Sequence, residues 1–144
     1  MSKINAGRVV LGGLLAGVVV NIFEYTLNGV LLAEDWANAM KALNKEMVES
    51  ASTIAIYLLW GFLIGILSIW LYAAIRPRFG AGAGTAVKAG ILMWLLVYLQ
   101  WVITMLTSGL FPTRLLLIAT ASGLVELVLA TVLGAWIYKE EATA

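Results

Sequence analysis

Four apolar runs, each long enough to cross a lipid bilayer, limit what this chain can fold into. They cover residues 9–32, 53–75, 86–110 and 115–138. A helix needs about 20 apolar residues to span the hydrocarbon core, and only helices and closed barrels satisfy their backbone polar groups in lipid. The sequence therefore predicts an all-α fold, an integral membrane four-helix bundle of four transmembrane helices forming a single domain over residues 1–144.

The composition supports a membrane protein and excludes several other classes. The chain is 62% hydrophobic and only 12% charged, with a mean hydropathy of +0.99. Soluble globular domains carry about 25% charged residues. The net charge is +1 and the charged residues gather between the apolar runs, so the chain lacks the basic stripe of a nucleic-acid-binding protein. The expected partner is the lipid bilayer, with no nucleic acid.

Cysteine and histidine are both absent from the sequence. This composition disfavours disulfides, thiol or imidazole catalysis, and the usual haem, zinc and copper sites. Hard cations such as Na⁺, Ca²⁺ or Mg²⁺ accept oxygen ligands, so they stay open as ligands of carboxyl and amide groups. We expect no cofactor and no resident metal.

The basic residues indicate how the chain is oriented, because Lys and Arg are retained on the cytoplasmic side of a membrane. One side carries Lys3, Arg8, Arg76, Arg78, Lys88 and Lys139; the other carries Lys41, Lys45 and Arg114. The sequence therefore predicts that both termini lie inside (N-in/C-in), in a bacterial inner (cytoplasmic) membrane. A cleaved signal peptide is disfavoured, since the first run is about twice the usual length of roughly 7–15 residues and contains Glu24.

The segment between the first two runs is polar but periodic. Trp36, Met40, Leu43 and Met47 follow one another at helical spacing, and Asp35 is a candidate N-cap. This pattern predicts an amphipathic helix over about residues 35–49. It is expected to lie on the outer membrane surface, and the alternative is a lid over an opening between the spans.

Two carboxylates, Glu24 and Glu126, lie near the middle of the first and fourth runs, which contain no Lys, Arg or His. A carboxyl group there indicates a functional site, and burial without a cationic partner favours a neutral acid or a bound cation. An ionised acid at the bilayer centre costs about 2.5–3.5 kcal/mol, whereas an intramembrane hydrogen bond contributes about 0.6 kcal/mol. This comparison favours function over the alternative, in which the acids only hold helices together.

Polar residues share helix faces with these two acids. On the first helix, Asn21, Glu24 and Asn28 recur every three or four residues, with Tyr25 beside them. On the third, Gln100 lies at a similar depth, and on the fourth Glu126 shares a face with small residues. The sequence predicts one proton-binding, cation-binding or polar-core site, composed of Glu24, Glu126, Asn21, Asn28, Gln100 and Tyr25.

Small residues predict where helices approach one another closely. The candidate helix-packing positions are Gly13, Gly17, Gly61, Gly65 and Gly123. Around the glycine-rich link at residues 76–84, the charged residues are basic and suit a lipid phosphate or simple anchoring of the topology. These candidate headgroup ligands are Arg76, Arg78 and Lys88.

Three functional hypotheses follow. The first is proton- or cation-coupled transport or channel activity as a homo-oligomer, because four helices alone enclose little space. The second is a non-catalytic accessory or scaffold subunit of a larger membrane complex, with Trp94, Tyr98 and Trp101 forming a stacking face for lipid or an apolar cofactor. The third, an intramembrane enzyme using Glu24 and Glu126 as acid and base, is the least favoured, and we expect no enzyme.

Overall fold

The computed structural model describes residues 3–47 and 50–140, and within these ranges the chain is helical without strands. Two of the long helices contain a π-helical segment, in which the backbone hydrogen bonds skip one residue more than in an α-helix. In chain order the elements are α1 (Ala6–Glu24), η1 (Tyr25–Leu31), α2 (Ala33–Ala42), α3 (Ala51–Phe79), α4 (Ala83–Trp94), η2 (Leu95–Leu99), α5 (Gln100–Ser108) and α6 (Thr113–Ile137).

Within residues 3–47 and 50–140, four helices are long and apolar enough to cross a membrane, as the sequence predicted. They are Ala6–Leu31, Ala51–Phe79, Ala83–Ser108 and Thr113–Ile137, with lengths of 26, 29, 26 and 25 residues. Each overlaps one of the four apolar runs. The chain is therefore an all-helical integral membrane protein, and this coarse level of the prediction is confirmed.

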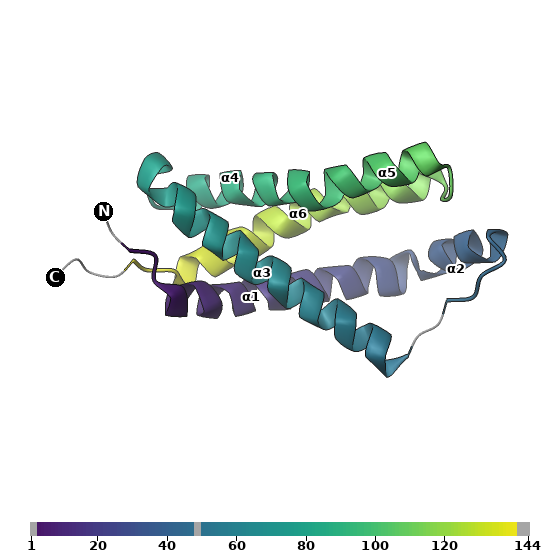
Figure 1. Cartoon of the computed structure of the whole chain (residues 1–144), viewed down its shortest axis with the longest axis horizontal. Coiled ribbons are helices and arrows are strands. Elements are labelled where there is room, and N and C mark those ends of the chain that lie inside the picture. The colour runs from purple at the N-terminus through teal and green to yellow at the C-terminus, as the bar shows by residue number, and fades with distance from the viewer. Residues whose placement is uncertain (1–2, 48–49, 141–144) are drawn as a thin grey trace.

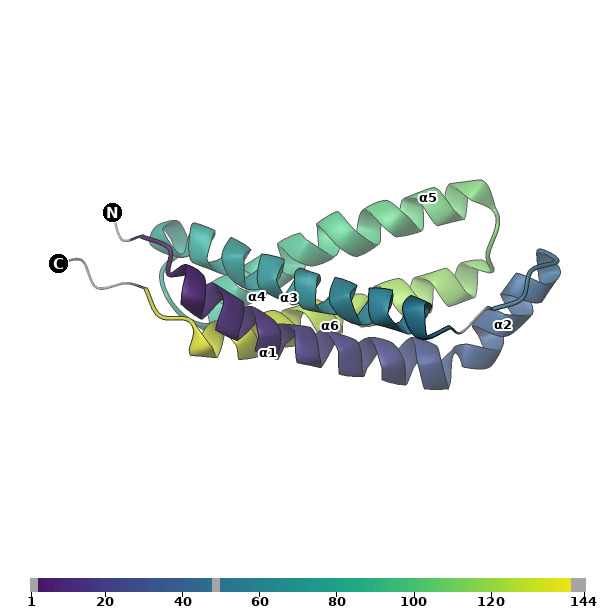
Figure 2. The same ribbon diagram turned by 60° about the horizontal axis from the view of Figure 1, so that its bottom comes forward.

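The bundle is closed at one end and splayed at the other. Both described ends of the chain and the link between α3 and α4 lie at one end, which we call the termini end; α2 and the link between α5 and α6 lie at the other, the α2 end (Figure 1). Helix α3 crosses the bundle obliquely, so its first residues lie apart from the other helices (Figure 1). Figure 2 shows that α5 also diverges from α6 toward the α2 end.

The hydrophobic core follows this shape. The main cluster joins α1, α3, α4 and α6 around fully buried residues such as Val20, Ile69 and Leu127. A smaller cluster of Leu32, Ala39 and Leu115 lies beneath α2. By contrast, none of residues 51–60 at the start of α3 is buried. Tight packing is thus concentrated toward the termini end.

Glycines bring α1 and α3 into backbone contact. A Cβ atom added at Gly65 would overlap the carbonyl oxygen of Gly13 and the amide nitrogen of Gly17. One turn away, Gly61 faces the side chain of Asn21. A further close contact, between α1 and α6, involves Gly12, where a Cβ atom would lie 2.5 Å from the carbonyl oxygen of Gly134. Small residues allow this approach, and the sequence analysis had overlooked Gly12.

Helix α2 differs from the predicted helix over residues 35–49. It begins at Ala33, directly after η1 and Leu32, so Asp35 lies in its first turn and does not cap it. It ends at Ala42, and Asn44 then adopts a left-handed conformation with φ of 54°. The final predicted residues, 48–49, lie outside the described ranges. The apolar spacing continues to Met47, beyond the end of the helix at Ala42, because the spacing of apolar residues carries no information about the turn at Asn44.

Candidate functional site

Glu24 and Glu126 belong to one site, and Tyr98 lies between them. The Tyr98 hydroxyl donates a hydrogen bond to Oε1 of Glu24, and the same hydroxyl lies 3.1 Å from Oε2 of Glu126. The three side chains come from three different spans. One phenol therefore bridges two carboxyl groups whose relative position could not be derived from the sequence.

Both π-helical segments meet at this site. Glu24 is the last residue of α1 before η1, and Tyr98 lies within η2. A π-helical turn holds an extra residue and so changes which side chains face inward; such turns are rare and frequently occur at functional sites. In the third span, the Tyr98 hydroxyl reaches the acids while Gln100, two residues later, is exposed.

Gly123 provides the space that the Tyr98 ring occupies. A Cβ atom at this position would overlap several carbon atoms of the ring. Gly123 precedes Glu126 by three residues on α6, so the same helix face holds the ring and one of the acids. The sequence assigned Gly123 to helix packing; its closest neighbour is the Tyr98 side chain.

A line of hydrogen bonds connects Glu24 to α2. Asn28 donates from Nδ2 to Oε2 of Glu24 over 2.7 Å, and its Oδ1 accepts a bond of 2.9 Å from Nε1 of Trp36. The Trp36 ring packs edge-on against Phe111 at 5.6 Å and lies 6.4 Å from the Trp101 ring. Asn28 thus couples the position of α2 to the carboxyl group of Glu24.

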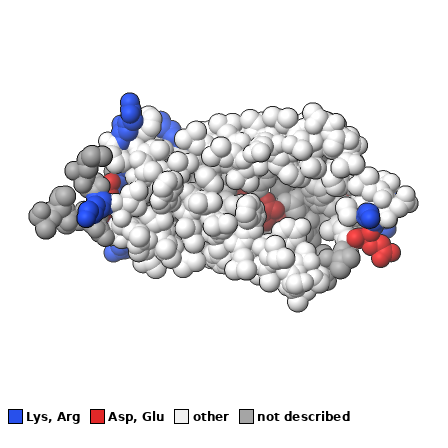
Figure 3. All heavy atoms as spheres, viewed as in Figure 1, with Lys and Arg blue, Asp and Glu red and all other residues white. Residues whose placement is uncertain are grey.

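The two acids differ in their surroundings. Glu126 is only 1% exposed, and its Oε1 has no hydrogen-bond partner among residues 3–47 and 50–140. Glu24 is half-buried. In Figure 3, red atoms of acidic residues are visible inside a hollow near the middle of the molecule, on the side of the α2 end. The hollow opens on the side of the bundle seen in Figure 3, and the main core lies between the acids and the termini end.

The number of available protons limits the protonation states of Glu24, Tyr98 and Glu126. A phenol carries one proton, and an ionised carboxylate only accepts hydrogen bonds. If the Tyr98 hydroxyl is hydrogen-bonded to both Glu24 and Glu126, one of these carboxyl groups must supply the second proton.

Within the described part of the chain, no group of three or more Asp, Glu, His or Cys residues could hold a metal ion.

The remaining predicted site residues lie elsewhere. Asn21 donates from Nδ2 to the carbonyl oxygen of Leu58 over 3.2 Å, across the contact between α1 and α3. Tyr25 is 71% exposed, with its ring beside Gly29. Gln100 is also exposed. The structure therefore brings together Glu24, Asn28 and Glu126 of the predicted set.

Tyr98 and Trp36 take part in the hydrogen bonds although the sequence analysis assigned both to apolar stripes. The signal that could have revealed Tyr98 was a hydroxyl near the middle of an apolar run, because buried tyrosines usually find a hydrogen-bond partner. For Trp36 the corresponding signal was an indole N–H close to the end of a span. Neither signal, however, identifies the partner.

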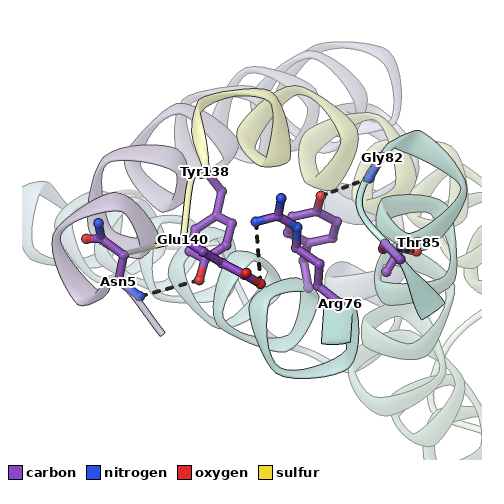
Figure 4. A network of polar contacts seen from close by, with 8 residues as sticks. Asn5, Arg76, Gly82, Thr85, Tyr138 and Glu140 are labelled. Carbon is purple, nitrogen blue, oxygen red and sulfur yellow. Dashed lines mark hydrogen bonds and ion pairs between the residues drawn. The ribbon is translucent and has the colours of Figure 1, made fainter. Parts of the chain in front are cut away.

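The basic residues proposed as headgroup ligands lie at the termini end. Arg76 forms an ion pair of 3.5 Å with Glu140, and its guanidinium lies 5.5 Å from the centre of the Tyr138 ring (Figure 4). Nζ of Lys88 lies 4.5 Å from the centre of the Phe79 ring. Arg78 is exposed.

The segments just before α1 and just after α6 meet α3 at the same end of the bundle. The Tyr138 hydroxyl accepts a hydrogen bond of 3.4 Å from the backbone N–H of Asn5 (Figure 4). The rings of Tyr138 and Tyr72 meet edge to face at 5.8 Å. These contacts join the start of α1, the end of α6 and the end of α3, and they reinforce the closed end of the bundle.

Comparisons with known proteins assign no family to this chain. No protein-family model matches it, and neither curated proteins nor solved structures give a significant match. Its function must therefore be inferred from the chemistry of the site.

Proposed function

We propose that this chain is a small proton-coupled membrane transporter or channel that works as an oligomer, with Glu24, Tyr98 and Glu126 as its proton-binding site. The observation that carries the proposal is the Tyr98 hydroxyl, which contacts both carboxyl groups but has a single proton to share. A carboxyl pair of this kind, contributed by two apolar spans and with acidic atoms visible in a hollow of the surface (Figure 3), suits the uptake and release of a proton.

The surroundings favour Glu126 as the acid that holds the proton. Both carboxyl oxygens of Glu24 accept a hydrogen bond, one from Asn28 and one from Tyr98. Glu126 is fully buried and has one oxygen without a described partner. In the proposed resting state Glu126 donates to the Tyr98 oxygen, and Tyr98 donates to Glu24.

Proton transfer through this site requires only short movements. Tyr98 passes its proton to Glu24 while it accepts the proton of Glu126, so the phenol is neutral before and after the step. The result is a protonated Glu24 and an ionised Glu126. Because Glu24 is half-buried whereas Glu126 is 1% exposed, we assign the exchange of protons with water to Glu24.

The geometry favours a proton over a hard cation. Na⁺, Ca²⁺ and Mg²⁺ need several oxygen ligands directed at one point. Here the position between the two carboxyl groups is taken by the Tyr98 hydroxyl, which contacts both. Coupling to a cation other than the proton is therefore the less favoured form of the proposal.

In the proposed mechanism protons enter from the splayed α2 end, because the main core packs the helices more tightly toward the termini end. With both termini in the cytoplasm, the α2 end faces outward and the site takes up protons from outside. Release to the other side then requires repacking of the main core or a path formed between subunits. Four helices enclose little space, which supports an oligomer.

Proton flux into reconstituted liposomes tests the proposal. Under an imposed pH gradient, we expect the protein to carry protons faster than protein-free vesicles. Tyr98→Phe and Glu126→Gln should slow this flux by about tenfold or more, because a positioned proton-transfer group contributes roughly a hundredfold or more to rate. Flux equal to that of empty vesicles, or unchanged flux in Glu126→Gln, contradicts the proposal.

Matched controls separate the site from general effects of the substitutions. Tyr57→Phe changes a tyrosine that is 69% exposed, and Glu46→Gln changes an exposed acid outside the spans. Both should retain the flux of the unchanged protein. Equal unfolding transitions in detergent would show that the variants are folded.

An accessory subunit is the second candidate, favoured by the first part of α3. None of residues 51–60 is buried, and they include Tyr57, Leu59 and Trp60, which are 69%, 70% and 53% exposed. Lipid covers apolar residues of this kind in a free span, whereas in the second candidate the helices of a partner protein cover them. Native mass spectrometry after gentle extraction distinguishes the candidates: a stoichiometric protein partner favours the subunit, and a homo-oligomer of this chain alone contradicts it.

A further inference from the structure

A cavity separate from the acid cluster lies at the α2 end. It is an open pocket with a volume of about 500 Å³, lined by α2, the link between α5 and α6, and the start of α6. Small-molecule sites commonly have volumes of about 300–1,000 Å³. None of the lining residues belongs to the hydrogen-bonded line from Trp36 to Glu126.

Opposite charges line this cavity without neutralising each other. Asp35 projects from α2 and Arg114 from α6. Both side chains are exposed, and within the described ranges they form no ion pair with each other; the ion pair there joins Arg76 and Glu140. The carboxylate can bind an ammonium group and the guanidinium can bind a phosphate or carboxylate. Asn38, three residues after Asp35, adds an amide to the same lining.

The rest of the lining is mainly apolar. Leu115 of the smaller hydrophobic cluster lines the cavity, together with Phe111 and Ile118, which pack against that cluster. Arg114 is the second residue of α6, so the charged groups lie where this span would enter the membrane interface. The cavity therefore combines two opposite charges with an apolar wall at the depth of lipid headgroups.

We infer that this cavity binds a compact zwitterion, with its ammonium group on Asp35 and its anionic group on Arg114. When the zwitterion is a lipid headgroup, the adjoining acyl chains pack against Phe111, Leu115 and Ile118. This chemistry occurs in a phosphatidylethanolamine headgroup and in free phosphoethanolamine. The inference is independent of proton transfer at Glu24 and Glu126, since the cavity shares no residue with them.

Binding to the purified full-length protein tests the site with two pairs of probes. In the lipid arm, native mass spectrometry compares phosphatidylethanolamine with phosphatidylglycerol, which lacks the amine. In the solute arm, calorimetry compares phosphoethanolamine with glycerol phosphate. In at least one arm we expect the zwitterion to bind at least about tenfold more tightly than the matched probe without an amine. This is the typical effect of one charge-assisted hydrogen bond.

Substitutions assign the binding to the two charges. Asp35→Asn should abolish the preference for the amine, and Arg114→Gln should weaken both members of a pair about tenfold or more. Glu34→Gln and Lys41→Gln are the controls, because they change exposed charges on α2 that do not line the cavity. All four variants should keep the unfolding transition of the unchanged protein.

The outcomes separate this inference from the proposed function. Preference in the lipid arm alone identifies a headgroup ligand, and preference in the solute arm identifies a free zwitterion; both support the site. No preference in either arm, or equal effects of Asp35→Asn and Glu34→Gln, overturns it. Because Glu126→Gln should leave this binding unchanged, a failure of proton flux does not affect the result.

Discussion

The ring of Tyr98 lies against Gly123 so closely that a methyl group at position 123 would overlap it. This contact places the hydroxyl within reach of Glu24 and Glu126. Helix α6 therefore supports the site in two ways, through the carboxyl group of Glu126 and through the absence of a side chain at Gly123.

Gly123→Ala should damage the site without removing any polar group. The added methyl group displaces the Tyr98 ring, and overpacking of this kind costs about 1–3 kcal/mol of folding free energy. We expect Gly123→Ala to reduce the proton flux by about the same factor as we expect for Tyr98→Phe. Unfolding in mixed detergent micelles measures the stability, and the liposome assay measures the flux.

A double substitution isolates the contact between the two residues. In a Tyr98→Ala background, Gly123→Ala should cost little further stability because the ring that it would overlap is gone. Gly84→Ala is the control, since no atom lies within 4 Å of a Cβ built there. Strictly additive effects of the two substitutions would show that the overlap is not what destabilises the single variant.

The proposed resting state predicts where the carboxylic proton resides. Glu126→Gln should remove the infrared carbonyl band of a protonated carboxyl group at neutral pH, because Glu126 is the acid assigned that proton. Glu24→Gln should leave such a band, since Glu126 remains. A band that persists in Glu126→Gln and disappears in Glu24→Gln would place the proton on the other acid.

Much of the fold could be predicted because lipid imposes strict rules on the chain. Each span must satisfy its own backbone hydrogen bonds, so the apolar runs alone located the four helices to within a few residues. The end of α2 could not be predicted in this way, because the apolar spacing from Trp36 to Met47 continues past Ala42, where the helix ends. The oblique crossing of α3 depends on contacts with α1 that are distant in sequence.

The site was predictable in part, and Gln100 and Tyr98 show where prediction fails. Helical spacing placed Glu24, Glu126 and a polar group of the third span at similar depth. It favoured Gln100, yet the residue beside the acids is Tyr98, within η2. A π-helical turn changes which side chains of the helix face the bundle interior. No residue pattern in this sequence predicts the turn. The sequence thus predicted the depth of the polar residues along each span, but it did not predict which of them face the bundle interior.

The glycines between α1 and α3 should differ in their tolerance of a side chain. Gly65→Ala would bring a methyl group onto backbone atoms of Gly13 and Gly17, which cannot rotate away. We expect this substitution to reduce the folding free energy by at least about 1–3 kcal/mol. Gly61→Ala is the matched comparison because it meets the movable side chain of Asn21. Greater destabilisation by Gly61→Ala would contradict this account of the crossing.

The hydrogen bond from Trp36 to Asn28 should hold α2 against the bundle. Trp36→Phe removes the indole N–H but keeps an aromatic ring against Phe111, so the expected loss is about 1 kcal/mol. Hydrogen exchange of the α2 amides should accelerate by about fivefold, with little change in α6. Trp60→Phe is the control, since that ring is 53% exposed on α3.

Asn28→Leu should have the larger effect, because it also removes the hydrogen bond that Glu24 receives. If α2 and the acid cluster are coupled, this variant accelerates exchange in α2 and slows proton flux together. Faster exchange with unchanged flux would mean that α2 is held by Asn28 but has no influence on the acids. Unchanged exchange in both Trp36→Phe and Asn28→Leu would instead show that aromatic packing alone holds α2 in place.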